Sequence, residues 1–198
     1  MNWETLLCLG DSITFGARSY FGYPEIAGNI LEKKLSKSWN IINHSTNGFT
    51  TIDLIRSLNP VITLYKEEFP SLITIMIGTN DIKNKTSLED FRIAYSQVIL
   101  KAKLMSVNNN IILFKIPHFT QKVFYPYHFE MNETVKLFNK VIEELASVNN
   151  IRTIQLELKD DDFFDGVHFS PKGSQTAAIQ LVNFILKDKG FESTPDMS

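Results

Sequence analysis

The sequence has very little cysteine, because Cys8 is the only one among 198 residues. A chain with one cysteine cannot form an intramolecular disulfide, which excludes a disulfide-stabilised scaffold. A chain of this length can bury a core large enough to fold without such cross-links. Cys8 lies in the apolar run Leu6–Leu9, so we expect it to be a small buried core residue and not a reactive thiol.

The sequence also lacks an excess of charge of either sign and a long apolar run. Lys and Arg number 20 against 22 Asp and Glu, which leaves a formal charge of −2. Proteins that bind nucleic acids or anionic membranes normally have a basic excess, so we expect neither partner. No stretch approaches the roughly 20 apolar residues of a membrane-spanning helix. The first residues show no signal peptide, so we expect a cytoplasmic protein without a membrane span.

Several common motifs are missing as well. The sequence contains neither the G-x-G-x-x-G string of dinucleotide-binding proteins nor the Walker A string of nucleotide-binding proteins. It also lacks the G-x-S-x-G elbow of α/β-hydrolases. His44, His118 and His128 show no metal-ligand spacing. We therefore expect neither a nucleotide nor a metal as a cofactor.

Strand-like and helix-like segments alternate along the whole chain. Short apolar or β-branched runs predict strands at residues 5–9, 40–44, 72–77, 111–116 and 151–156. Helical periodicity predicts helices at residues 23–37, 51–58, 87–105, 133–148 and 171–187. We expect Asn59-Pro60 to interrupt the second helix, with a further short helix continuing to residue 66.

Strands separated by helices imply right-handed crossovers, and therefore a parallel sheet with helices on both faces. The predicted fold is a three-layer α/β/α domain. No linker or internal repeat divides the chain. We expect one domain over residues 1–198, with a core at about 5–187 and a short tail at 190–198.

The residues that follow the predicted strands are the candidates for a site, since parallel α/β sheets bind ligands at the carboxyl ends of their strands. Ser12 follows the first strand in Gly10-Asp11-Ser12 and offers a hydroxyl nucleophile. Asp165 and His168 precede the last helix, and an imidazole oriented by a carboxylate is a general base near neutral pH. Gly48 and Asn80 follow the second and third strands and offer a backbone and a side-chain N–H as oxyanion donors.

Each of these features alone has a plain structural explanation. Asp11 or Ser12 could simply be the cap of the next helix, without a role in catalysis. Gly48 and Asn80 are residue types that are common in turns. Together, however, the loops hold a nucleophile, a base, an orienting acid and two donors, which is the set of roles that acyl transfer needs. We expect Asp11 and Asp81 to make structural hydrogen bonds, because a carboxylate beside an oxyanion hole would oppose the developing negative charge.

The blocks that hold these residues resemble those of the GDSL-type, or SGNH, hydrolase family of esterases and lipases. They are GDSIT at 10–14, NHSTNGFTT at 43–51, GTND at 78–81 and DGVHFS at 165–170, in the family's order over residues 5–185. The resemblance implies a flavodoxin-like fold with a five-stranded parallel sheet and no cofactor. Ile13, Ser45 and Phe169 depart from the family's usual residues, and none of the three is a catalytic group.

The same resemblance implies the role of each site residue. Ser12 is the nucleophile, His168 is the base, and Asp165 orients the imidazole. The oxyanion hole consists of the N–H groups of Ser12 and Gly48 and the side-chain amide of Asn80. The expected activity is that of a serine esterase acting on small or medium carboxylic esters, with a small-molecule ester as its partner.

Residues 117–131 form a loop that is rich in aromatic side chains, among them Phe119, Phe124, Tyr125 and Tyr127. These side chains could anchor the loop by packing, or they could form an apolar wall or lid that contacts the substrate. Other functions of the same family stay open, namely glycan O-deacetylase, lysophospholipase and thioesterase. The alternative of a different class is a non-catalytic binding module on the same scaffold. The sequence does not decide the oligomeric state.

Overall fold

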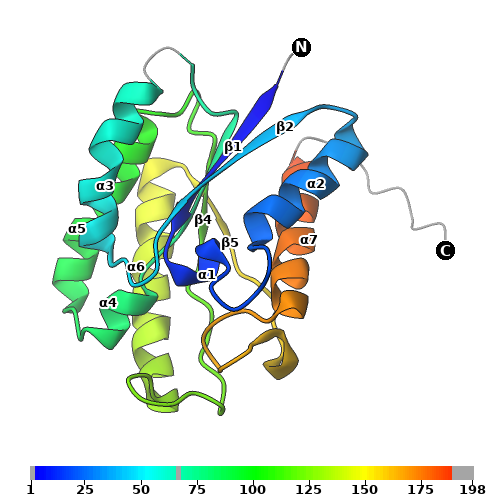
Figure 1. Ribbon diagram of the computed structural model, residues 1–198. Helices are drawn as coiled ribbons and strands as arrows, with labels where there is room; N and C mark the ends of the chain where they lie inside the picture. The colour runs from blue at the N-terminus through cyan, green and yellow to red at the C-terminus, as the bar shows by residue number, and fades with distance from the viewer. Residues whose placement is uncertain (1–2, 66–67, 189–198) are drawn as a thin grey trace.

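A five-stranded parallel sheet forms the centre of the computed structural model, which describes residues 3–65 and 68–188 (Figure 1). Its strands are β1 (Glu4–Gly10), β2 (Trp39–Ser45), β3 (Leu72–Met76), β4 (Ile111–Phe114) and β5 (Arg152–Ile154). They lie in the order β2-β1-β3-β4-β5, and every neighbouring pair is parallel. The structure thus confirms the five predicted strands and the parallel sheet, and the strand order is that of flavodoxin-like folds.

Helices cover both faces of this sheet, which confirms the predicted three layers. On one face lie α2 (Tyr23–Leu35) and α7 (Pro171–Asp188), which contact each other. On the other face, α5 (Leu88–Lys103) lies between α3 (Thr51–Leu64) and α6 (Asn132–Asn149). None of the helices within residues 3–65 and 68–188 combines the length and the apolar character needed to cross a membrane.

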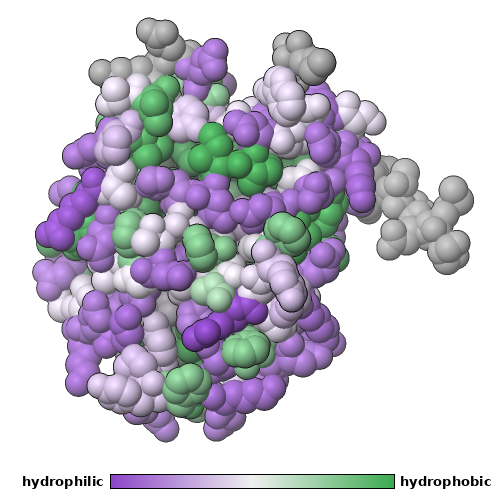
Figure 2. Space-filling view, in the orientation of Figure 1, coloured by the Kyte–Doolittle hydropathy of each residue, from purple (hydrophilic) through white to green (hydrophobic). Residues whose placement is uncertain are grey.

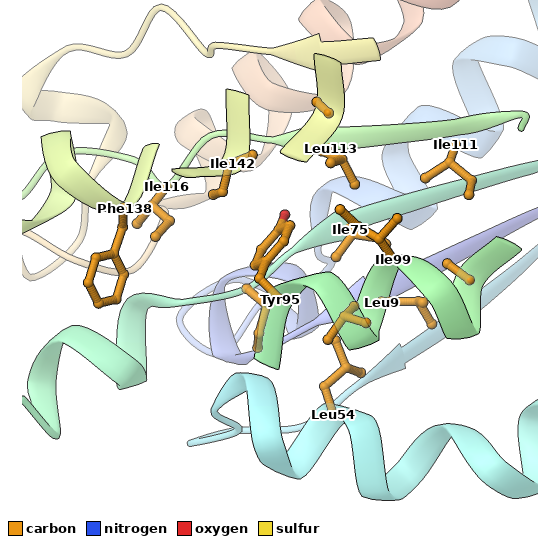
Figure 3. Packing of buried hydrophobic residues seen from close by; sticks show 14 of the residues in the cluster. Leu9, Leu54, Ile75, Tyr95, Ile99, Ile111, Leu113, Ile116, Phe138 and Ile142 are labelled. Carbon is orange, nitrogen blue, oxygen red and sulfur yellow. The ribbon is translucent and has the colours of Figure 1, made fainter. Parts of the chain in front are cut away.

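Two apolar clusters hold the layers together, because successive strand residues point to opposite faces of the sheet. Leu9 and Ile75 belong to the cluster under α3, α5 and α6, where Figure 3 shows them beside Tyr95 of α5. Cys8 belongs to the other cluster, and burial raises the pKa of its thiol to about 12. A fully buried Leu or Ile side chain stabilises the fold by about 1.5–3 kcal/mol, so these clusters dominate its stability.

The predicted break at Asn59-Pro60 is wrong, because α3 continues through Pro60 to Leu64. A proline inside a helix removes one backbone hydrogen bond. Here Leu58 and Val61, on both sides of the proline, are buried in the core and hold the helix in place. The end predicted at residue 66 and the tail predicted at 190–198 lie outside the described residues.

Two short helices occupy segments that the sequence predicted as loops. They are α1 (Ser12–Phe15), directly after β1, and α4 (Thr79–Lys83), after β3. Segments of four and five residues are too short to show a helical period. Both helices begin at the carboxyl edge of the sheet, where the candidate site residues lie.

Candidate active site

Strand pairing brings Ser12, Gly48 and Asn80 to the same edge of the sheet. In this pairing Gly10, the last residue of β1, lies opposite Ser45 of β2 and Met76 of β3. Each of the three candidate residues follows one of these strand ends within a few positions. The three residues therefore lie at the ends of three neighbouring strands, at one edge of the sheet, as the sequence predicts.

Ser12 is the first residue of α1, and the local sequence fixes its position. The Asp11 side chain caps the helix, because its Oδ1 accepts a hydrogen bond from the Ile13 N–H at 3.0 Å. Gly16 ends the helix at φ +82, a left-handed conformation that favours glycine. Ser12 itself is only 6% exposed, so its hydroxyl is held in one environment and not free in solvent.

Chain segments 156 positions apart meet at this hydroxyl. The Ser12 Oγ lies 3.0 Å from the His168 Nε2, and the His168 Nδ1 lies 2.8 Å from the Asp165 Oδ2. An ionised carboxylate can only accept hydrogen bonds, so the Nδ1–H of His168 donates to Asp165. The Nε2 is then the ring's acceptor, and it faces the Ser12 O–H. The structure thus places the three predicted residues in one hydrogen-bonded chain.

Asp165 is fixed by its own turn and stays ionised. Its Oδ1 accepts hydrogen bonds from the N–H groups of Val167 at 3.1 Å and His168 at 2.8 Å. Burial by itself would raise the pKa of this carboxyl, but hydrogen bonds from the His168 ring and the two N–H groups lower the pKa to about 2. Arg18 adds a cation 3.8 Å from Oδ2.

The predicted oxyanion donors are the N–H groups of Ser12 and Gly48 and the side-chain amide of Asn80. Gly48 adopts φ +83, and its N–H makes no hydrogen bond within the described part of the chain. The same is true of the Ser12 N–H. The Asn80 side chain is 2% exposed, and its Nδ2 donates to the Phe49 carbonyl oxygen at 2.9 Å. All three residues follow strands that end at the same edge of the sheet.

Asp81 and Asp11 make structural hydrogen bonds, as the sequence predicts. Asp81 holds the first residue of α3, because its two oxygens accept from the Thr51 hydroxyl at 2.6 Å and the Thr51 N–H at 3.0 Å. Asp11 caps α1. Burial raises the pKa of the Asp11 carboxyl to about 7, which keeps it protonated over part of the neutral range and reduces negative charge beside Ser12.

The aromatic loop after β4 is clamped to α6 by two asparagines. Asn132 binds both the N–H and the carbonyl of Phe119, and Asn139 does the same for Ile116. Phe119 is 1% exposed and packs inside the core, so it offers no surface to a ligand. We therefore leave it out of the proposed substrate contacts.

The tip of the same loop is open to solvent. Phe124 is 67% exposed and Tyr125 is 81% exposed. The loop contacts the turn that holds His168, since the Thr120 N–H donates to the Gly166 carbonyl at 3.0 Å. Phe124 and Tyr125 are thus the most exposed aromatic residues of the loop, and a 3₁₀ turn, Phe129–Met131, leads the loop back to α6.

The sequence predicts Tyr127 near the site but not its contact there, and it predicts neither Lys83 nor Arg18 as a site residue. Lys83 donates to the Asn80 Oδ1 at 2.8 Å, and Tyr127 donates to the same oxygen at 3.1 Å. Arg18 lies beside Asp165. A signal exists only for Lys83, because residues three apart share one face of a helix. No group of three or more His, Cys, Asp or Glu side chains in the described residues is arranged to hold a metal ion.

Comparison with known proteins identifies the family. A model of the GDSL-like lipase/acylhydrolase family matches residues 8–176, a range that contains every candidate catalytic residue. A comparison with curated proteins finds no match.

Solved structures share the fold. A lipase/acylhydrolase from Enterococcus faecalis is 21% identical, with a TM-score of 0.76 over 98% of this chain and 100% of the other. A variant of an acetyl xylan esterase from Geobacillus stearothermophilus is 22% identical, with a TM-score of 0.74 over 98% and 97% of the two chains. A lipolytic G-D-S-L family protein from Veillonella parvula is 19% identical, with a TM-score of 0.76 over 92% and 97%. These structures share the fold, and the family match over residues 8–176 shows that this chain belongs to the GDSL-like lipase/acylhydrolase family and is an ester-hydrolysing enzyme.

Proposed function

We propose that this protein is a serine esterase that hydrolyses small or medium carboxylic esters through an acyl-enzyme on Ser12. One observation supports this most strongly, namely the continuous chain from the Ser12 Oγ through the His168 ring to the Asp165 carboxylate, with distances of 3.0 Å and 2.8 Å. This arrangement is the one that serine nucleophiles use to lose their proton during attack.

Acylation follows from the roles of these groups. As the Ser12 oxygen forms a bond with the ester carbonyl carbon, the His168 Nε2 takes the hydroxyl proton. Asp165 stabilises the resulting imidazolium. The carbonyl oxygen becomes an oxyanion that accepts hydrogen bonds from Ser12, Gly48 and Asn80. The bond to the leaving oxygen then breaks, and His168 gives its proton to the departing alcohol.

Deacylation repeats these steps with water as the nucleophile. His168 takes a proton from water, and the water oxygen bonds to the acyl carbon of the Ser12 ester. The second oxyanion occupies the same donors. Its collapse breaks the bond to the Ser12 oxygen, which regains the proton from His168. The acid leaves and the enzyme returns to its initial state.

The surroundings of the site support a small or medium ester as substrate. Figure 2 shows that the face on which α1 lies is mostly hydrophilic and that its hydrophobic residues form separate patches. The exposed Phe124 and Tyr125 form the apolar part of the 117–131 loop nearest to solvent. We assign these two side chains to contact with the acyl or alcohol group of the substrate. They form a short open wall and not a buried tunnel.

The experiment that tests this proposal is a panel of p-nitrophenyl esters from acetate to decanoate. Wild type, Ser12→Ala and Phe124→Ala are measured side by side, with Ser147→Ala on the exposed face of α6 as the matched serine control. We expect Ser12→Ala to lose turnover by roughly 10⁶-fold with its fold intact, and Ser147→Ala to match wild type. We expect Phe124→Ala to weaken the preference among acyl lengths. A Ser12→Ala protein with wild-type turnover would reject the proposal.

A further inference from the structure

Hydrogen bonds from three separate segments hold the Asn80 side-chain amide. Its Nδ2 donates to the Phe49 carbonyl at 2.9 Å, on the segment that follows β2. Its Oδ1 accepts from the Lys83 Nζ at 2.8 Å, on α4, and from the Tyr127 hydroxyl at 3.1 Å, on the loop after β4. Because Asn80 is buried, water does not replace these partners.

This network leaves one hydrogen-bonding position of the Asn80 side chain without a partner among the residues named above. An asparagine side chain has two N–H donors and two acceptor positions. Lys83 and Tyr127 fill both acceptor positions, and Phe49 takes one donor, so one N–H remains. Turning the amide over would put its N–H groups against the Lys83 ammonium and its oxygen against the Phe49 carbonyl. The network therefore permits one orientation only.

We infer that Lys83 and Tyr127 are positioning residues, which orient and polarise the Asn80 amide so that its one free N–H stabilises the oxyanion. This inference rests on the proposed function, in which Asn80 is an oxyanion donor. It goes beyond that function, because neither residue contacts the reacting atoms in the proposed mechanism. Both act through Asn80.

Lys83 supplies the polarising charge. It lies three residues after Asn80 on α4, so both side chains share one face of the short helix. A hydrogen bond from an ammonium to an amide oxygen is charge-assisted and stronger than a neutral one. It draws electron density toward the oxygen and makes the opposite N–H groups better donors. The effect increases as negative charge develops on the substrate, so Lys83 favours the transition state over the bound ester.

Tyr127 supplies the second donor and ties the loop to the site. Burial raises the pKa of its hydroxyl, and the nearby carboxylates of Asp11 and Asp165 raise it further, so the hydroxyl keeps its proton and donates. The Tyr127 ring packs on Phe119, with ring centroids 5.3 Å apart, and Asn132 clamps the Phe119 backbone. The buried half of the aromatic loop thus supports the oxyanion donor.

The test compares Lys83→Met and Tyr127→Phe with wild type on p-nitrophenyl acetate. We expect kcat to fall by about 10-fold for each variant, the size of one lost hydrogen bond of this kind, while KM changes little. Inhibition by an aryl trifluoromethyl ketone, whose adduct on Ser12 places an oxyanion at the same donors, weakens in proportion. Unchanged kcat and inhibition in both variants would overturn the inference.

Two controls isolate the effect. Lys85→Met makes the same change at an exposed position just after α4, and Tyr20→Phe removes a hydroxyl from an exposed ring. Both controls are expected to keep wild-type kinetics. Circular dichroism and thermal unfolding show whether every variant is folded, so a loss of activity by unfolding is recognised.

A double-mutant cycle separates action through Asn80 from independent action. In an Asn80→Ala background, adding Lys83→Met or Tyr127→Phe is expected to cause no further loss of kcat. A full additional 10-fold loss there would overturn the inference, since the residue would then act without Asn80. Ser12→Ala shows whether the proposed function or only the present inference fails. If Ser12→Ala keeps activity, the proposed function fails. If Ser12→Ala is inactive while Lys83→Met and Tyr127→Phe are fully active, only the inference about Lys83 and Tyr127 is refuted.

Discussion

The site has an imidazole side, with Asp165 and His168, and a proposed oxyanion side, with Asn80. The two sides differ in how far apart along the chain their contacting residues lie. On the imidazole side, Asp165 and His168 are three residues apart, and one turn holds both, because the Asp165 carboxylate binds the backbone and the ring of His168. On the oxyanion side, Asn80 is held by partners 31 and 47 residues away, Phe49 and Tyr127. A local turn forms from its own residues, whereas the oxyanion side exists only when three loops have folded against one another.

This difference leads us to expect different responses to mutation. On the imidazole side, a single carboxylate orients the ring of the proposed base, so we expect the loss of that group to remove the base function. On the proposed oxyanion side, several N–H groups and the residues that hold them contribute together, so we expect single changes to give graded losses. The following predictions test this contrast, beginning with the largest effect.

Asp165→Asn tests the imidazole side. The asparagine oxygen can still accept from the two backbone N–H groups, so we expect the turn to persist. Its amide would donate to the His168 Nδ1 and move the ring proton to Nε2, where it can no longer accept the Ser12 proton. We expect kcat to fall by roughly 10³–10⁴-fold, measured by ester hydrolysis at saturating substrate. Asp160→Asn, at an exposed position of the 3₁₀ turn Asp160–Asp162, is the control, and equal activity of the two variants would contradict the assignment.

Asn80→Ala tests the oxyanion side. Removing one oxyanion donor is expected to lower kcat by about 10²–10³-fold, less than Asp165→Asn, because the Ser12 and Gly48 N–H groups remain. Steady-state kinetics with p-nitrophenyl acetate measures the loss. Asn84→Ala, at the end of the same short helix, is the matched control. An Asn80→Ala enzyme with unchanged kinetics would reject the role of this amide.

Asp11 directly precedes Ser12, and its titration affects the stability of the fold. The pKa of this carboxyl is about 7 in the folded protein, raised by burial, with His168 and Asp81 acting in opposite directions. Since the unfolded value is about 4, the folded state binds more protons between these values. The free energy of unfolding therefore falls as pH rises through this range.

Asp11→Asn removes that titration while its amide oxygen can still cap α1. We expect the difference in unfolding free energy, variant minus wild type, to be higher at about pH 8 than at about pH 4.5, by on the order of 3 kcal/mol. Urea unfolding at both pH values measures it. The same difference at both pH values would show that Asp11 does not titrate in this range.

Gly48→Ala tests the backbone conformation of a proposed oxyanion donor. An added Cβ would meet no atom within 4 Å, so the cost comes only from the backbone at φ +83. A left-handed conformation costs a non-glycine residue about 1–2 kcal/mol, and we expect thermal unfolding to show a loss of this size. Gly48→Asn is expected to lose less, because asparagine tolerates this conformation better. Equal stability of all three proteins would mean that the turn relaxes.

The sequence predicts much of the fold because its signals are local. Alternating apolar runs and helical periods identify the strands and the long helices, and the crossover rule then implies the parallel sheet. The short helix α1 is missed because four residues show no period. The break at Pro60 is predicted wrongly because the packing of Leu58 and Val61 on the core outweighs one missing hydrogen bond.

The candidate site likewise has a part that the sequence predicts and a part that it does not. The spacing of Asp165 and His168 indicates a turn that joins them, and the structure shows that turn. The contact of Tyr127 with Asn80 depends on how the loop after β4 folds back over the sheet, for which the sequence has no short-range signal. Tyr127 could be predicted as an aromatic residue near the site, but its hydrogen bond to Asn80 could not.

The most direct test of the account asks which atom becomes covalently bound. A fluorophosphonate places phosphorus where the ester carbonyl carbon would lie, and the attacking oxygen displaces fluoride as the base takes its proton. Intact mass and peptide mapping after such labelling identify the modified residue. We predict one adduct, on Ser12, that forms in wild type and is lost in His168→Ala. Loss of esterase activity with the adduct on another residue and Ser12 unmodified would contradict the account.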